Sequence, residues 1–96
     1  MIDVESYEAV ISQLESYKEK VNDGTSAMKT AATECVDATE GDEAVKVSKD
    51  NLDNAIKKID AALSDIDKVV AAMKEQVRKA KEAAAKARAA AQSAGN

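Results

Sequence analysis

The chain has 96 residues, with 18 acidic and 14 basic side chains, a net charge of −4 and a single Cys, and it contains no His, Phe, Trp or Pro. Its apolar fraction of 45% rests largely on Ala, which buries little area per side chain. A compact core is therefore hard to build, and one extended seam between helices is the expected solution. An acidic chain without a basic stripe beside aromatic residues is a poor nucleic-acid binder.

The first part of the chain predicts a long helix over about residues 3–39. Asp3 suits its N-cap, since the carboxylate can accept from first-turn N–H groups. Turn-forming residues around Gly24 argue for a loop, but the seven-residue register continues across them, which favours one helix weakened or bent there over a break. A complementary row runs through residues 4, 11, 18, 25 and 32. The predicted seam consists of Tyr7, Leu14, Val21 and Met28, continued by Cys35.

Residues 39–43 predict a tight turn between helices, with Thr39, Gly41 and Asp42 as its motif. Gly41 can take the left-handed conformation that ends a helix, and Asp42 can cap the next one. Asp37, Glu40, Asp42 and Glu43 cluster here, and helix capping is a better explanation than a Ca²⁺ site because the spacing does not match an EF-hand loop.

The second helix is predicted over about residues 43–92. Its apolar residues alternate in steps of four and three, which places them on one helix face. The predicted seam consists of Leu52, Ile56, Ile59, Leu63, Ile66, Val70, Met73 and Val77.

Together the two segments predict an all-α fold, an antiparallel two-helix hairpin over residues 1–79. Folding the chain about Gly41 pairs residues whose numbers sum to about 82. The first residues of the first helix then lie near residue 79 of the second, and the large apolar residues of the second helix stop close to this point, at Val77. One seam alone is marginal, so we expect association into a four-helix bundle with a second copy or a different helical protein. The predicted partner-binding residues are Val10, Tyr17, Val36, Val47 and Val69.

Residues 80–96 predict an Ala-rich basic helical tail that frays at its end. Its apolar face is only Ala, which disfavours membrane-surface binding, whereas a solvated extension or recognition by a partner remain open. No segment is long enough to cross a membrane, and the acidic start does not resemble a signal peptide. We therefore expect a cytoplasmic protein, or one exported without a cleavable signal. The candidate targeting residues are Arg78, Lys79, Lys81, Lys86 and Arg88.

Catalysis has little support in the residues. His, the commonest general base, is missing, and Cys35 lies on the predicted seam as a small buried apolar side chain without a neighbouring base. We expect no catalytic, cofactor or metal site.

The plan of the chain resembles the WXG family of small type VII secretion proteins, the Esx-like helical hairpins. The likeness lies in about a hundred residues, two amphipathic helices and a Gly-centred turn, in which Gly41 matches the motif glycine and Thr39 takes the place of its Trp. The family's export signal, a Tyr followed four residues later by an acid, has no match after Gly41. This combination is similar to Trp-less accessory members that pair with the helical N-terminal domain of an LXG-type toxin in Gram-positive bacteria.

The resemblance implies a non-enzymatic partner, a targeting factor or chaperone, that binds the helical domain of a secreted effector and helps to direct it to export. The periodicity by itself equally suits a homodimeric coiled-coil structural or scaffold protein outside secretion.

Overall fold

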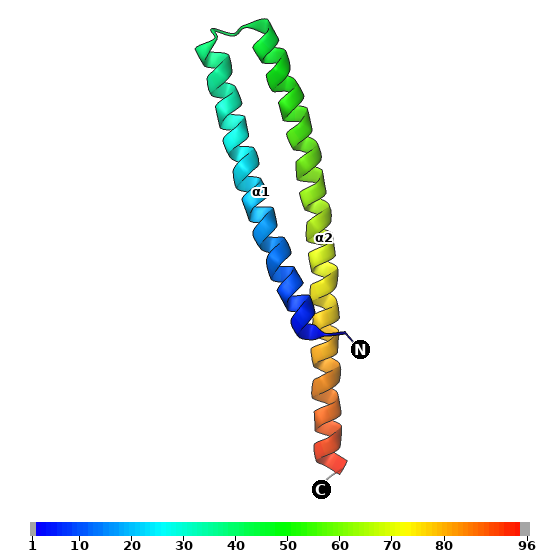
Figure 1. The fold of residues 1–96 in the computed structure, drawn as a ribbon. Helices are drawn as coiled ribbons and strands as arrows, with labels where there is room; N and C mark the ends of the chain where they lie inside the picture. Colours follow the sequence, from blue (N-terminus) through cyan, green and yellow to red (C-terminus); the bar gives the residue numbers. More distant parts are fainter. Residues whose placement is uncertain (1, 95–96) are drawn as a thin grey trace.

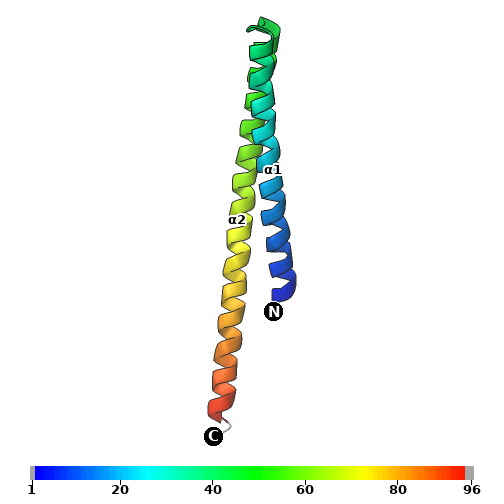
Figure 2. The ribbon, with the colours of Figure 1, turned by 90° about the vertical axis from the view of Figure 1, so that its left-hand side faces the viewer.

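The computed structural model describes residues 2–94 as two long helices joined by a short turn (Figure 1). Helix α1 spans Val4–Ala38 and helix α2 spans Glu43–Ala94. The helices run antiparallel in a rod of 81 × 15 × 14 Å, which is equally thin in the perpendicular view (Figure 2). Residues 2–94 contain no strand. The predicted all-α two-helix hairpin is confirmed.

Helix α1 begins as its sequence predicts and runs without a break. The Asp3 carboxylate accepts a hydrogen bond from the Ser6 backbone N–H (3.3 Å) and one from the Ser6 hydroxyl (2.7 Å). The helix continues through Gly24, so the continuous helix was the right choice over a loop. Thr25, which follows it, is buried, and its hydroxyl donates to the Asn22 carbonyl (3.1 Å), so the buried polar group is satisfied.

The turn closes with paired backbone hydrogen bonds. Gly41 N–H donates to the Val36 carbonyl (2.9 Å) and Glu40 N–H to the Asp37 carbonyl (3.2 Å), the pattern of a Schellman motif. Gly41 is left-handed as predicted, with φ 76°, but Glu40 before it is left-handed too, with φ 56°. Asp42 caps α2 by accepting from the Val45 N–H at 3.2 Å.

The seam on α2 follows the prediction, while the seam on α1 follows it only in part, since Tyr7 and Leu14 pack against the core but the later members are exposed. Four α2 residues spaced by seven are buried: Ile56, Leu63, Val70 and Val77. On α1 the residues buried against them include Ile11 and Thr25, members of the row that was predicted only as complementary. Tyr7 and Leu14 are half-buried, but Val21 and Met28 are 39% and 42% exposed, and Cys35 is exposed.

Charged residues explain why α1 is rotated so that Ile11 and Thr25 are buried while Val21 and Met28 are exposed. All side chains of a helix turn together when the helix rotates about its axis. If α1 were rotated to point Val21 and Met28 directly at α2, the neighbouring row with Glu8 and Glu15 would therefore turn away from the lysines that it contacts on α2. The observed rotation keeps those pairs in contact. The predicted burial of Val21, Met28 and Cys35 was therefore wrong.

The alignment of the two helices along the rod, judged from the residues that pair across them, also differs from the prediction. The residue numbers of opposing charges sum to 85 for Lys18–Asp67 and to 89 for Glu8–Lys81, rather than 82. The turn does not account for the difference, because the helix ends Ala38 and Glu43 sum to 81; the reach and tilt of the long charged side chains do. As a result Ala80 is half-buried and Lys81 still touches α1, so α2 overhangs from about residue 82. The helix then continues to Ala94, two residues past its predicted end, while Gly95 and Asn96 lie outside the described residues.

Candidate partner-binding groove

The two long edges of the hairpin differ in chemistry, and the first is closed by charge. Four ion pairs connect the helices along this ion-paired edge, and two shallow clefts there are lined largely by the same charged side chains. Each exposed pair contributes only about 0–1 kcal/mol, so their effect is mainly on register and on access. The pairs are Glu8–Lys81 (3.1 Å), Glu15–Lys74 (2.7 Å), Lys18–Asp67 (2.5 Å) and Lys29–Asp60 (4.0 Å).

The opposite edge is apolar and uncovered. With 100° between successive residues, Glu8 and Glu15 fall on one side of buried Ile11, and Leu14 and Val10 fall on the other. On that other side no cross-helix ion pair is found among residues 2–94. We call it the open edge, and its exposed large side chains are Val10 (41%), Tyr17 (57%), Val21 (39%) and Met28 (42%) on α1 and Val69 (52%) on α2.

The floor of the open edge is formed by half-buried members of the predicted α2 seam. Leu52, Ile59, Ile66 and Met73 are all half-buried, next to the fully or nearly buried row that contains Ile56. The hairpin therefore buries one row of α2 and, on α1, Ile11 and Thr25, and it leaves a second apolar row of each helix partly in water. A surface of this kind is what a further helix needs in order to pack.

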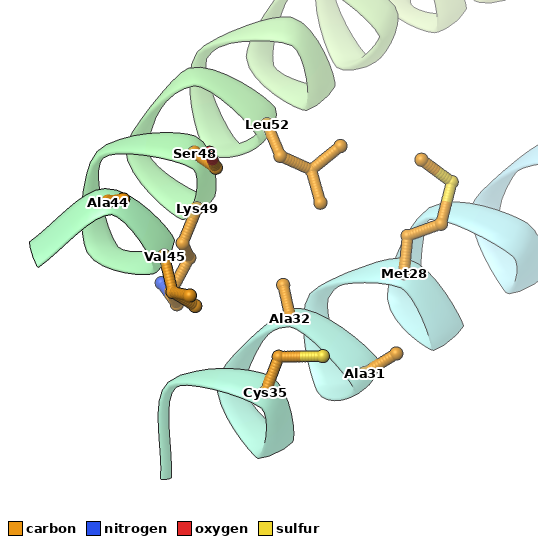
Figure 3. A pocket seen from close by; sticks show the side chains of 9 residues that line it. All are labelled: Met28, Ala31, Ala32, Cys35, Ala44, Val45, Ser48, Lys49 and Leu52. Carbon is orange, nitrogen blue, oxygen red and sulfur yellow. The ribbon is translucent and has the colours of Figure 1, made fainter. Parts of the chain in front are cut away.

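Beside the turn the open edge widens into a cleft of about 580 Å³, which we call the turn cleft. Met28 and Leu52 point into it from α1 and α2, and Ala32 lines it on α1 between Met28 and Cys35 (Figure 3). The space exists because most of the side chains around it are small. The remaining lining residues are Ala31 and Cys35 on α1 and Ala44, Val45, Ser48 and Lys49 on α2.

The predicted partner-binding residues do not all lie together. Val10, Tyr17 and Val69 lie on the open edge. Val36 is half-buried near the turn, in the same row as Glu8 and Glu15 of the ion-paired edge. Val47 is 56% exposed but lies in the row of Asn54 and Lys68, which faces away from α1.

Val21 and Met28 belong to the open edge, although their seven-residue spacing predicts them inside the seam. The signal that could have found them is the charge pattern. Glu8 and Glu15 are seven apart, as are Lys74 and Lys81, and an antiparallel alignment brings the two rows together. This alignment fixes which apolar row of α1 stays outside.

The predicted targeting residues fall into two groups. Arg78 lies between two carboxylates of its own helix, Glu75 and Glu82, at 2.7 Å from each. These contacts, first of all the hydrogen bond with Glu75, raise the pKa of Arg78, and the same bond lowers the pKa of Glu75. Lys86 pairs with Glu82 (3.1 Å) and Lys81 with Glu8. Within residues 2–94, Lys79 and Arg88 lie within 4.0 Å of no carboxylate.

No group of three or more His, Cys, Asp or Glu side chains is placed to hold a metal ion in residues 2–94. The Cys35 thiol is free and exposed at the turn cleft. Lys49, also at the cleft, is held by Asp53 (2.8 Å), and that hydrogen bond raises the pKa of Lys49.

Neither helix, over the residues described, has a stretch apolar enough to cross a bilayer. No protein-family model, curated protein or solved structure matches this chain. The open edge is therefore the feature on which a function has to be argued.

Proposed function

We propose that this chain is a non-enzymatic helix-binding protein that pairs with the helical N-terminal domain of a secreted effector and helps to direct it to a type VII export machine. The observation that carries the proposal is the asymmetry of the hairpin, with one edge closed by four ion pairs and the other left apolar. A protein with one open apolar edge docks a partner on one side.

The dimensions of the open edge suit a pair of helices. From Val10 to Cys35 the edge is about 38 Å long at 1.5 Å per residue, and two helices side by side make it about 20 Å wide. The resulting area of about 750 Å² is close to the ~800 Å² that each partner contributes to a standard protein interface. Covering both the α1 and the α2 side of this edge takes two further helices, which completes a four-helix bundle.

The hairpin also has a physical need for a partner. Among residues 2–94, five apolar side chains form its buried core: Ile11, Ile56, Leu63, Val70 and Val77. A single seam of this size leaves a long helix pair only marginally stable. Burying the open edge adds the missing apolar contact.

The choice of an exported effector as partner rests on the resemblance to the WXG family. In the structure, Gly41 occupies a left-handed turn between two long antiparallel helices, as that resemblance implies. The overhang of α2 beyond residue 81 carries Arg88 and follows Lys79, neither of which meets a carboxylate among the residues that the structure describes; an export machine could recognise this surface once the complex has formed. On this proposal the chain acts in the cytoplasm and travels with its client or stays behind.

The test is co-expression with the helical N-terminal domain of an effector encoded next to this chain. Val69→Glu places a charge on the open edge, and Val47→Glu places the same charge on the outward face of the same helix at similar exposure. We expect the effector domain to co-purify with wild type and Val47→Glu and its recovery to fall at least tenfold with Val69→Glu. Equal recovery with both variants, or no complex with any adjacent helical effector, would contradict the proposal.

A further inference from the structure

One apolar repeat runs through the whole chain and keeps its phase across the turn. The row of residues at multiples of seven runs from Tyr7 to Val77, and it is apolar except at Asp42 and Lys49. The row three positions later runs from Val10 to Ala80 and holds no charged residue. A hairpin does not require this agreement, because a turn allows each helix a phase of its own. Two apolar rows that keep one phase throughout are the pattern of a single coiled-coil helix.

The hairpin uses this repeat on α2 but only in part on α1. Ile56 and the three members that follow it on α2 are buried. On α1 the buried residues Ile11 and Thr25 belong to a different row, while Val21 and Met28 stay exposed. Tyr7 and Leu14 contact the core only at the end far from the turn. The hairpin therefore leaves most of the α1 part of the repeat without a partner.

The turn that interrupts the repeat is short and strained. It consists of residues 39–42 at one end of the rod (Figure 1), and the chain contains no Pro. Glu40 is held at φ 56°, which is unfavourable for a residue with a Cβ. Asp37 lies in the last turn of α1, which has no basic residue to match the negative end of the helix dipole. A helix that continued through the turn would remove both costs.

The main cost of such a continuous helix is Gly41, because glycine loses more backbone freedom in a helix than other residues do. Gly24 already occupies a helix interior in α1, so this chain tolerates a glycine there.

We propose that the turn is a hinge and that the chain has a second state, in which residues 39–42 are helical and α1 and α2 form one straight helix. Two such helices exchange halves, so that α1 of each copy packs on α2 of the other. We call this state the exchanged dimer. The hairpin is the state of the isolated chain, and the exchanged dimer forms by mass action when copies meet.

The register of the hairpin carries over to the exchanged dimer. The ion pairs Lys18–Asp67 and Glu8–Lys81 have residue numbers that sum to 85 and 89, and a sum of 87 lies between them. With that sum, every member of the first apolar row faces a member of the second row on the other copy. The two-fold axis then crosses each helix between residues 43 and 44.

The facing residues are complementary in size. In the middle of each half, large side chains of α2 meet small residues of α1, whereas two valines meet towards the end. These facing pairs are Leu63 with Gly24, Ile56 with Ala31, and Val77 with Val10. A parallel pair of straight helices would instead set Asp42 against Asp42 and Lys49 against Lys49, where like charges repel. The sequence therefore favours the antiparallel exchange.

This inference does not rest on an export function, since it concerns the chain by itself. In the exchanged dimer Val10, Tyr17 and Val21 lie inside the seam, so the open edge no longer exists. In the setting of the proposed function, the exchanged dimer is a form that cannot bind a client, and the hairpin is the form that can.

The distance between the two helices of one chain tests the proposal. Ser26→Cys with Ala61→Cys, in a Cys35→Ser background, places spin labels at two exposed positions. The labels are about 25 Å apart in the hairpin, whereas 35 residues of continuous helix span about 52 Å. The labelled chain is refolded from urea with a tenfold excess of the unlabelled Cys35→Ser chain, so that only distances within one chain are observed. We expect the short distance alone at about 1 μM, and the long distance in a dimer fraction at about 0.5 mM.

Substitutions at the hinge should shift this equilibrium in opposite directions. Glu43→Pro suits the first residue of α2 but breaks any helix that continues through it. It should keep the helical content of the dilute chain and abolish both the long distance and the dimer. Glu43→Ala removes the same charge without the ring, and as the matched control it should retain both. Gly41→Ala disfavours φ 76° and favours a helix, so it should raise the association constant at least tenfold.

Three results would overturn the proposal. A dimer that shows only the short distance at the higher concentration means that the copies associate as hairpins. Wild type and Gly41→Ala that both remain monomeric there mean that the hinge does not open. A long distance that persists in Glu43→Pro means that it does not arise from a continuous helix.

Discussion

The Glu15 carboxylate lies 2.7 Å from the Nζ of Lys74, and this ion pair connects the two helices on the edge opposite to the exposed valines. Together with its neighbour Glu8–Lys81 it fixes both the register of the hairpin and the side that stays open. The rotation of α1 by one row, which decides what a partner can reach, therefore agrees with the surface charges, whereas the apolar pattern of α1 alone leaves two adjacent rows to choose from.

Reversing Glu15 should therefore destabilise the hairpin modestly and be rescued by its partner. We expect Glu15→Lys to lower the free energy of unfolding by about 1 kcal/mol or less, because both side chains are half exposed. Glu15→Lys with Lys74→Glu should recover most of the loss. Urea unfolding followed by circular dichroism at low and high salt measures both, and an effect unchanged by salt would argue against the ion pair.

The buried row of α2 should dominate stability. Ile56 is the side chain with no exposed surface, so Ile56→Ala should cost about 2–5 kcal/mol in the free energy of unfolding. Val47→Ala, on the outward face of the same helix, should stay within about 0.5 kcal/mol. The urea midpoints of the two variants provide the comparison, and similar midpoints would mean that the seam lies elsewhere.

At the turn, Glu40 holds a left-handed conformation that suits glycine better. Glu40→Gly should therefore raise the free energy of unfolding, by up to about 1 kcal/mol, since it removes the steric cost of a Cβ at φ 56°. Gly41→Ala should act in the opposite direction, because φ is 76° there and the new Cβ would lie 3.1 Å from Lys46 Cε. Thermal melting tests both, and destabilisation by Glu40→Gly would show that this turn geometry is not populated.

Lowering the pH should destabilise the hairpin at the N-terminus of α1, which Asp3 caps, and along α2. The Ser6 hydroxyl lowers the pKa of Asp3, and Arg78 lowers the pKa of Glu75, from ordinary values of 3.8 and 4.5. Because the folded values are the lower ones, the stabilising effect is complete above the ordinary values and is lost as the pH falls through the lowered ones. The melting temperature should therefore fall below about pH 4.

The control for this acid transition is Asp3→Asn with Glu75→Gln, which keeps hydrogen-bonding side chains but removes both titrations. Its melting temperature should depend less steeply on pH in the acid range. An unchanged slope would assign the acid transition to other carboxylates.

The sequence predicts this fold well because local signals and the long-range pattern agree. Asp3, Gly41 and Asp42 act at the helix ends as their chemistry predicts, and the seven-residue row through Ile56 and Val70 is buried. The rotation of α1 was not predicted, because two adjacent rows of α1 both carry apolar residues. Distinguishing them needs the cross-helix pairs, which exist only once a register is chosen. The turn cleft was missed for a related reason, since small residues in a helix pattern do not show whether a neighbour fills the space beside them.

We propose that other helices bind at the open edge and not at the outward face of the hairpin. Val69→Cys and Val47→Cys, each in a Cys35→Ser background, report on the two faces of α2 from residues of similar exposure. The measurement is the rate of thiol labelling at a concentration at which sedimentation shows the chain to be associated, relative to the rate at high dilution. We predict that labelling at position 69 slows at least tenfold while labelling at position 47 is unchanged. Equal rates at the two positions, or protection at position 47 instead, would contradict the account.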